Sequence, residues 1–220
     1  RLDRSPDEAQ SKEILATAGL RFAKESVAAT ADEAVAAAEG MGYPVVIKVL
    51  SPEIGHKSEV GGVALNLTNE SAVREAFGRV IENAGRAVPE AEIRGVTVAQ
   101  MVTGGVQTII GGHRDPMFGP IVMFGLGGIY TEVLKDTVLR TAPVTHETAL
   151  EMIRSVRAFA ILDGARGQER ADLDAIADAI VRVSQFIAIQ GPEVESVEIN
   201  PFISLPKGGC GVDALIHIRD

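Results

Sequence analysis

The stretch from Val96 onwards most constrains the fold, because short apolar segments alternate there with Gly, Pro and Asp. Such spacing is typical of antiparallel strands joined by turns. Two helical stretches, at 147–159 and 172–190, follow, and a last pair of strands is expected at 194–202 and 211–218. This half of the chain is therefore expected to form a mainly antiparallel sheet with helices. Its earlier strand-like segments are VTVAQMV, GVQTIIGGH, GPIVMF and DTVLRTAPV.

The first half of the chain has a different pattern, in which helices and strands alternate. The expected elements are helices at 6–19, at 31–42 and from the capping residue Asn69 to 85, and strands at 45–50 and 63–67. The fold class is therefore α/β (α+β), with two lobes. Residues 1–98 would form the N-terminal helix and first lobe, and residues 99–220 the second, with a hinge near Gln100.

Composition excludes several partners. The 220 residues are 46% hydrophobic with a formal net charge of -9, so a core is available but no surface suited to nucleic acid or an anionic membrane is expected. No apolar run reaches the roughly 18 residues of a membrane span, and RLDRSPDEAQ is too polar for a signal peptide. The single cysteine, Cys210, cannot form an internal disulfide and has no activating base nearby, which favours a reducing cytoplasm and no catalytic thiol.

Lys48 is the one charge in the apolar run VVIKVL. An ammonium group is costly to bury there unless an anion meets it, so Lys48 either binds phosphate or extends to water from an edge strand. The loop SPEIGHKSEVGG follows, and its glycines would let the backbone approach a charged group beside His56. A neutral imidazole can act as a nucleophile, but a solvated surface histidine is the alternative.

The segment MFGLGGIYTEVLKD contains Gly125, Gly127 and Gly128. It matches neither a Walker loop nor a GxGxxG fingerprint, so a tight turn between strands is the alternative to phosphate contact. The histidines have no spacing typical of a zinc site. They are His56, His113, His146 and His217.

Glu198 and Asn200 are two residues apart on an expected strand and therefore share a face, with Asp213 on the next strand. Mg²⁺ takes one or two carboxylates, completed by substrate phosphates and water. The three side chains are thus a candidate magnesium site, and two solvated acids on a hairpin are the alternative.

The chain contains, in this order, GYPVVIKVLSP, GHKSEVGGV, RDPMFGPIVMFGLGGIYTEVLKD, RTAPV, VEINPF and GVDALI. Together they resemble the ATP-grasp domain of nucleoside-diphosphate-forming acyl-CoA synthetases such as acetate–CoA ligase and, more distantly, the β subunit of succinyl-CoA synthetase. The resemblance covers nearly the whole chain. It implies an ATP-grasp fold, with a nucleotide cleft between two α+β lobes.

The resemblance also implies roles for individual residues. Lys48 would touch phosphate oxygens of ATP or ADP, and the strand with Gln100, Met101 and Val102 would offer backbone groups to the adenine edge. The remaining implied ligands are Gly125, Gly127, Gly128 and Arg140 for phosphate, and Asn200 and Asp213, with Glu198 beside them, for Mg²⁺.

By the same resemblance, His56 would receive a phosphoryl group from a phosphohistidine of a separate CoA-binding domain or α subunit and deliver it to ADP. That partner would bind the small carboxylic acid and CoA, in an α2β2 assembly or a dimer of fused chains. The overall reaction would be acyl-CoA + ADP + phosphate ⇌ acid + CoA + ATP. Two other functions stay open: a nucleotide-sensing regulatory domain of a protein acyltransferase, and an ATP-grasp ligase that acts through an acyl phosphate.

Overall fold

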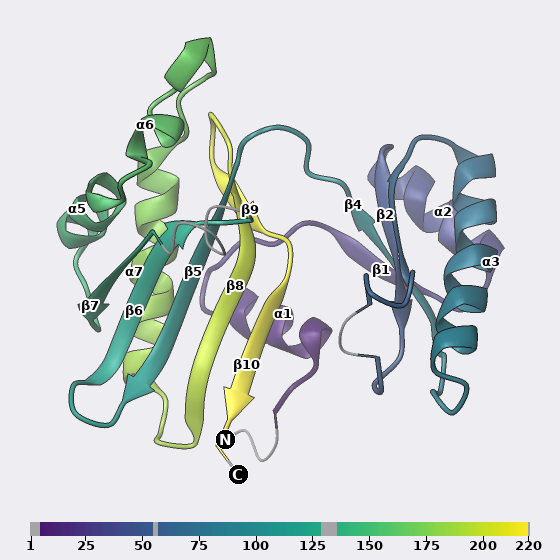
Figure 1. Cartoon of the computed structure of the whole chain (residues 1–220), viewed down its shortest axis with the longest axis horizontal. Helices are drawn as coiled ribbons and strands as arrows, with labels where there is room; N and C mark the ends of the chain where they lie inside the picture. Colours follow the sequence, from purple (N-terminus) through teal and green to yellow (C-terminus); the bar gives the residue numbers. More distant parts are fainter. Residues whose placement is uncertain (1–4, 55–56, 129–135, 220) are drawn as a thin grey trace. The chain divides into compact units, whose positions relative to one another are not determined.

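The computed structural model describes residues 5–54, 57–128 and 136–219, without the side chain of Arg166. The chain divides into two compact units. Unit 2 is the continuous segment 23–103, whereas unit 1 combines residues 1–22 with residues 104–220. Each unit has its own sheet and its own core (Figure 1). No helix in the described ranges is long and apolar enough to cross a bilayer.

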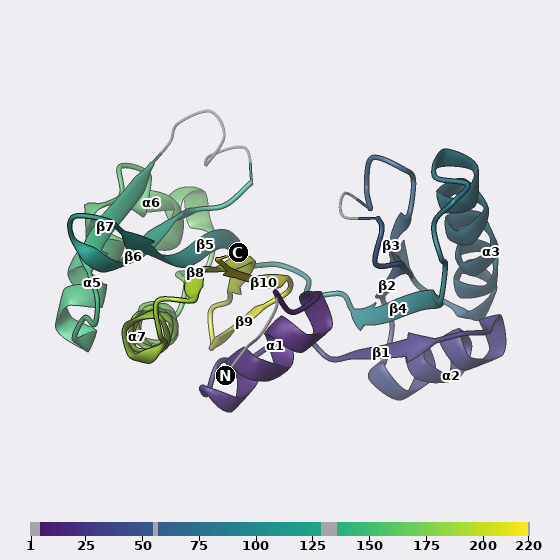
Figure 2. The ribbon, with the colours of Figure 1, turned by 90° about the horizontal axis from the view of Figure 1, so that it is seen from below.

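Unit 2 is a four-stranded antiparallel sheet with two helices packed on one face (Figure 2). The strand order is β1-β4-β2-β3. The elements are β1 (Glu25–Ala28), α2 (Ala31–Met41), β2 (Val45–Leu50), β3 (Val63–Leu67), α3 (Glu70–Ala87) and β4 (Gly95–Gln100). From α2 to α3 this confirms the predicted sequence of helix, strand, loop, strand and helix, whereas β1 was not predicted.

Alternation along β2 decides which face carries the core of unit 2. Val45, Ile47 and Val49 are fully buried in the cluster shared with the two helices. Successive side chains of a strand point to opposite faces, so Lys48 lies on the helix-free face. The N-cap of α3 is Asn69, as predicted, and its side chain accepts a hydrogen bond from the N–H of Ala72 at 3.0 Å.

Unit 1 is a six-stranded antiparallel sheet in the order β10-β8-β5-β6-β7, with β9 paired to β8. Its strands are β5 (Val106–Asp115), β6 (Gly119–Leu126), β7 (Thr137–Thr141), β8 (Val194–Ser204), β9 (Gly209–Gly211) and β10 (Ala214–Ile218). Its helices are α1 (Glu8–Thr17), α5 (His146–Ser155), α6 (Phe159–Leu162), the 3-10 turn η1 (Ala165–Gly167) and α7 (Leu173–Ile189). The predicted antiparallel sheet is confirmed.

Helices α1, α5 and α7 lie on one face of this sheet (Figure 2). Val122, Phe124 and Leu126 point from β6 into the core, where they meet Ile180 and Ile187 of α7. Polar side chains of β8, including Glu198 and Asn200, lie on the opposite, helix-free face of the sheet.

Helix α1 lies along the outer edge of β10. The hydroxyl of Ser11 accepts a hydrogen bond from the N–H of Ile216 at 3.2 Å, and the hydroxyl of Ser5 accepts one from the N–H of Ile218 at 3.0 Å. Leu15 of the same helix is fully buried in the unit 1 core. These contacts cover an edge that would otherwise present unpaired N–H groups.

This placement differs from the prediction, which put the N-terminal helix in the first lobe. Residues 5–17 pack against β10, near the other end of the chain, and sequence order gives no sign of such a distant contact. The boundary near Gln100 also shifts, because Gln100 pairs with Val45 and unit 2 continues to residue 103.

Candidate functional site

Lys48 lies between two neighbouring strands, opposite Val63 of β3 and Thr97 of β4. Because β2 is an inner strand of the sheet, the interpretation of Lys48 as an edge-strand lysine is wrong. Its side chain is half-buried on the helix-free face of unit 2. Its contact with phosphate stays a prediction.

The histidine loop joins β2 to β3, and His56 itself lies outside the described residues. Both flanks of the loop are anchored to unit 2. Ile54 is buried in its core, and the N–H of Val49 donates to the carbonyl of Gly62 at 2.7 Å. Asn83 of α3 donates to the carbonyl of Gly61 at 3.3 Å. The predicted carrier and the predicted phosphate-binding lysine therefore belong to the same unit.

The segment predicted to meet adenine also belongs to unit 2. The N–H of Gln100 donates to the carbonyl of Lys24 at 2.8 Å, and the N–H of Met101 donates to the carbonyl of Pro44 at 3.1 Å. Both donors are thus used within the unit. A contact of this segment with a nucleotide is therefore expected to use its carbonyl oxygens, its side chains or the backbone N–H of Val102.

The glycine-rich segment begins at the end of β6. Gly125 pairs with Ile109 and Thr137, and the N–H of Gly127 donates to the carbonyl of Gln107 at 2.8 Å. Gly128 has a φ of 63°, in the left-handed region that favours glycine. Close packing and backbone conformation thus account for some of these glycines without a bound ligand. Residues 129–135, which complete the segment, lie outside the described ranges.

Arg140 lies on β7, directly opposite Val122. Val122 is a core residue, and cross-strand partners share a face, so Arg140 is on the helix-covered side of the sheet. It is exposed and donates to the carbonyl of Leu139 at 2.8 Å. The register therefore separates it from the acidic residues of β8, and its contact with phosphate stays a prediction.

The structure brings together the three residues predicted to hold magnesium. Glu198 and Asn200 lie on the helix-free face of β8, because the residue between them, Ile199, is fully buried in the core. The side-chain amide of Asn200 donates to Glu198 Oε1 at 3.0 Å. Its backbone N–H donates to the carbonyl of Asp213 at 3.0 Å, so β8 and the residue just before β10 lie side by side.

This donor set fits Mg²⁺. It offers two carboxylates and one amide, all hard oxygen donors, and the amide of Asn200 can present its oxygen because its nitrogen faces Glu198. In the described part of the chain, no three His, Cys, Asp or Glu side chains form a group that could hold a metal. A cation here would need further oxygens from water or phosphate, as Mg²⁺ commonly does.

Sequence reasoning missed Lys12. This lysine is only 5% exposed, and its ammonium lies 2.8 Å from Glu8 Oε1 and 3.7 Å from Asp213 Oδ1. A signal was present in the sequence: Lys12 stands three residues before Leu15, so it shares the buried face of α1. The buried cation thus contacts a predicted metal ligand.

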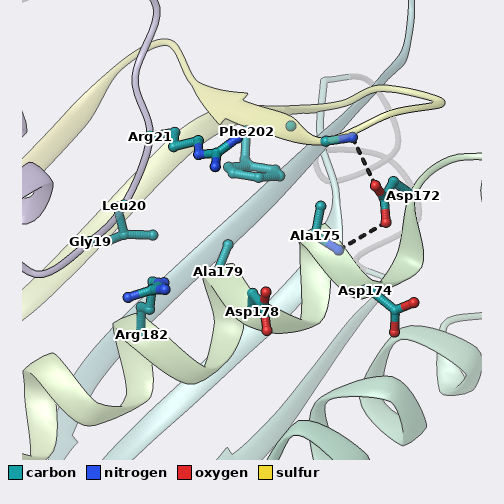
Figure 3. A pocket seen from close by; sticks show the side chains of 12 residues that line it. Gly19, Leu20, Arg21, Asp172, Asp174, Ala175, Asp178, Ala179, Arg182 and Phe202 are labelled. Atoms are coloured by element: carbon teal, nitrogen blue, oxygen red, sulfur yellow. Dashed lines mark hydrogen bonds between the residues drawn. The ribbon is translucent and has the colours of Figure 1, made fainter.

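A pocket of about 400 Å³ lies elsewhere in unit 1, beside the first turns of α7 (Figure 3). It is lined by charges of both signs, from Arg21, Arg182, Asp174 and Asp178. Asp172, at its rim, accepts hydrogen bonds from the N–H groups of Gly208 and Ala175. None of the predicted nucleotide or metal residues lines this pocket.

Cys210 is half-buried on β9, and burial raises the pKa of its thiol. A raised pKa disfavours the thiolate, the reactive form. His146 lies 3.5 Å from Asp178 Oδ1, on the exposed side of α5 and α7.

Comparison with known proteins identifies the family. A family model described as an ATP-grasp domain matches residues 3–218. The β subunit of ADP-forming acetate–CoA ligase I from Pyrococcus furiosus is 45% identical over 94% of this chain and 89% of that subunit. The ADP-forming acetate–CoA ligase I of Archaeoglobus fulgidus is 46% identical over 93% of this chain but only 30% of its own length.

Solved structures agree. Acetyl-coenzyme A synthetase 1 of Ca. Korarchaeum cryptofilum, in complex with coenzyme A, Ca-AMPCP and HgCl+, superposes with a TM-score of 0.93 at 42% identity. The superposition covers 98% of this chain and 94% of the other. The chain thus spans nearly all of the Pyrococcus subunit and under a third of the longer Archaeoglobus relative. It belongs to the ATP-grasp family, on the branch of the β components of ADP-forming acid–CoA ligases.

Proposed function

We propose that this chain is the ATP-binding component of an ADP-forming acyl-CoA synthetase and that His56 carries the phosphoryl group to and from the nucleotide. The observation that carries the proposal is that Glu198 and Asn200 of β8 lie beside Asp213, just before β10, and together they offer oxygen donors suited to a metal–phosphate complex. The relatives are named for this reaction, and one is solved with an AMPCP complex of a divalent cation.

Each residue has a defined task in the transfer. Lys48 would hold phosphate oxygens by charge, while Asn200 and Asp213 would hold Mg²⁺, which when bound neutralises charge on the phosphates. In the direction of ATP synthesis, a terminal oxygen of ADP attacks the phosphorus on His56. The P–N bond breaks as the new P–O bond forms, and the released imidazole is neutral after it takes up a proton. Such transfers depend mainly on positioning and charge.

The acid and CoA would bind to a CoA-binding domain or α subunit, as an α2β2 assembly or a dimer of fused chains. The β-subunit relative supports a separate chain, and the longer relative supports a fused one. The single cysteine is consistent with a cytoplasmic protein. The overall reaction would be acyl-CoA + ADP + phosphate ⇌ acid + CoA + ATP.

Labelled ATP tests the carrier role. Purified chain incubated with Mg²⁺ and γ-labelled ATP should acquire an acid-labile, base-stable label, because a phosphorylated imidazole has this stability. His56→Ala should lose the label. His217→Ala, which removes an exposed histidine of β10, is the matched control and should keep it.

Other outcomes would point to other functions. Label that persists in His56→Ala would overturn the assignment of the carrier. An unlabelled wild-type chain would favour a regulatory domain. Full turnover by His56→Ala with the CoA-binding partner present would favour a ligase that works through an acyl phosphate.

A further inference from the structure

We propose that Lys12 is a positioning residue for the metal site and acts through Asp213: its fixed positive charge keeps a divalent cation weakly bound until a nucleotide supplies phosphate oxygens. The inference rests on the proposed function, in which Asn200 and Asp213 hold Mg²⁺. It adds a residue from α1, an element outside the β8–β10 hairpin that carries the other ligands.

The geometry favours an electrostatic effect over a direct hydrogen bond. The Lys12 ammonium lies 2.8 Å from Glu8 Oε1, a hydrogen-bonded ion pair, but 3.7 Å from Asp213 Oδ1. The longer distance exceeds that of a hydrogen bond, but opposite unit charges still attract each other across it. The Lys12 side chain is 6% exposed and that of Asp213 is 37% exposed. Asp213 can thus contact a ligand while Lys12 cannot.

Charge counting gives the sign of the effect. In their ordinary forms Glu8, Asp213 and Glu198 are negative and Lys12 is positive. The ammonium attracts the Asp213 carboxylate and repels any cation that this carboxylate would bind. Removing the ammonium should therefore strengthen cation binding, whereas removing the negative charge of Glu8 should weaken it.

Mn²⁺ serves as the probe, because its free form is measured by electron paramagnetic resonance. The whole chain is titrated with and without ADP. Lys12→Met should bind Mn²⁺ more tightly without ADP, on the order of tenfold, and ADP should then increase the affinity less than it does in wild type. Glu8→Gln should weaken Mn²⁺ binding several-fold. Lys12→Arg keeps the charge and should resemble wild type.

The opposite signs separate the proposal from a purely structural role of the ion pair, since structural damage would weaken binding in both variants. Lys12→Met with unchanged or weaker Mn²⁺ binding would overturn the proposal. If circular dichroism shows that Lys12→Met does not fold, Glu8→Gln decides: weaker binding supports the proposal, and unchanged or tighter binding overturns it.

Asp213→Asn distinguishes failure of this inference from failure of the proposed function. If Asp213→Asn leaves Mn²⁺ binding in the presence of ADP unchanged, the metal site itself is misassigned. If Asp213→Asn weakens binding while Lys12→Met does not strengthen it, the metal site stands and Lys12 has no part in setting its affinity.

Discussion

Gly125 occupies a position that has no room for a side chain. An added Cβ would lie 2.8 Å from the carbonyl oxygen of Asp136 and 2.8 Å from Cγ2 of Thr137. Gly125→Ala is therefore expected to lower the free energy of unfolding by about 1–3 kcal/mol, the usual range for overpacking. Urea unfolding followed by circular dichroism measures the change.

A glycine with free space provides the matched control. Gly78 lies within α3, and nothing approaches its added Cβ within 4 Å. Gly78→Ala should raise the free energy of unfolding by about 0.5–1 kcal/mol, because alanine is the better helix former. If Gly125→Ala proved as stable as wild type, packing would not explain this glycine, and contact with phosphate would be the remaining reason for it.

Individual residues differ in how far the sequence reveals them. Lys48 was identifiable because a charge within an apolar strand is conspicuous, and its inner-strand position removes one of its two interpretations. Glu198 and Asn200 were predictable from a spacing of two. Lys12 was not recognised because lysine is common on exposed helix faces, although its spacing from Leu15 put it on the apolar face of α1, and the packing of α1 against β10 buries it.

Among the elements, the junction before α7 depends on one carboxylate. Asp172 accepts hydrogen bonds from Gly208, in the turn before β9, and from Ala175, in the first turn of the helix. These two bonds hold the pKa of Asp172 below its usual value. The charged carboxylate therefore stabilises the fold at pH values above its unfolded-state pKa of about 3.9, and this contribution is lost as the pH falls through the lower folded pKa.

Asp172→Asn tests this linkage. The variant keeps a capping oxygen but has no charge, so wild type should be more stable at neutral pH by about 1 kcal/mol, and the difference should shrink below about pH 4. Urea unfolding at a series of pH values gives the difference. Glu169→Gln, at an exposed carboxylate shortly before α7, controls for the change in net charge. A difference that stayed constant down to pH 2 would contradict the role of the charge.

The positions of helices and strands along the chain were predicted better than the contacts between them. Alternation and turn residues located most strands of both sheets, since side-chain period and turn chemistry are local properties. The short strands β1 and β9 were not predicted. The helix predicted at 172–190 is α7. The stretch 147–159 is not one helix, because α5 ends at Ser155 and the short α6 begins at Phe159. The pairing of α1 with the edge of β10 joins residues 205 apart in the chain, a separation that no local pattern encodes.

At the scale of the whole molecule, the chain passes between the units twice, after residue 22 and after residue 103. Unit 1 is therefore built from two separate stretches of the chain, the first of which contains α1, whereas unit 2 is one continuous segment. The predicted division at residue 98 followed the change in sequence pattern, at which alternating helices and strands give way to consecutive short strands. The sequence pattern could not show that residues 1–22 belong to the same compact unit as residues 104–220.

Continuity predicts that residues 23–103 fold alone. Their core is a separate cluster, with Ile47 and Val98 fully buried between the sheet and two helices, and segments of similar size fold independently. The fragment should give a dispersed amide NMR spectrum and unfold cooperatively, while the same fragment with Ile47→Asp should not. A collapsed spectrum of the unmodified fragment would show that unit 2 depends on unit 1. Since the fragment contains Lys48 but none of the β8 ligands, it should fold and yet bind no Mn²⁺, which would assign the metal to unit 1.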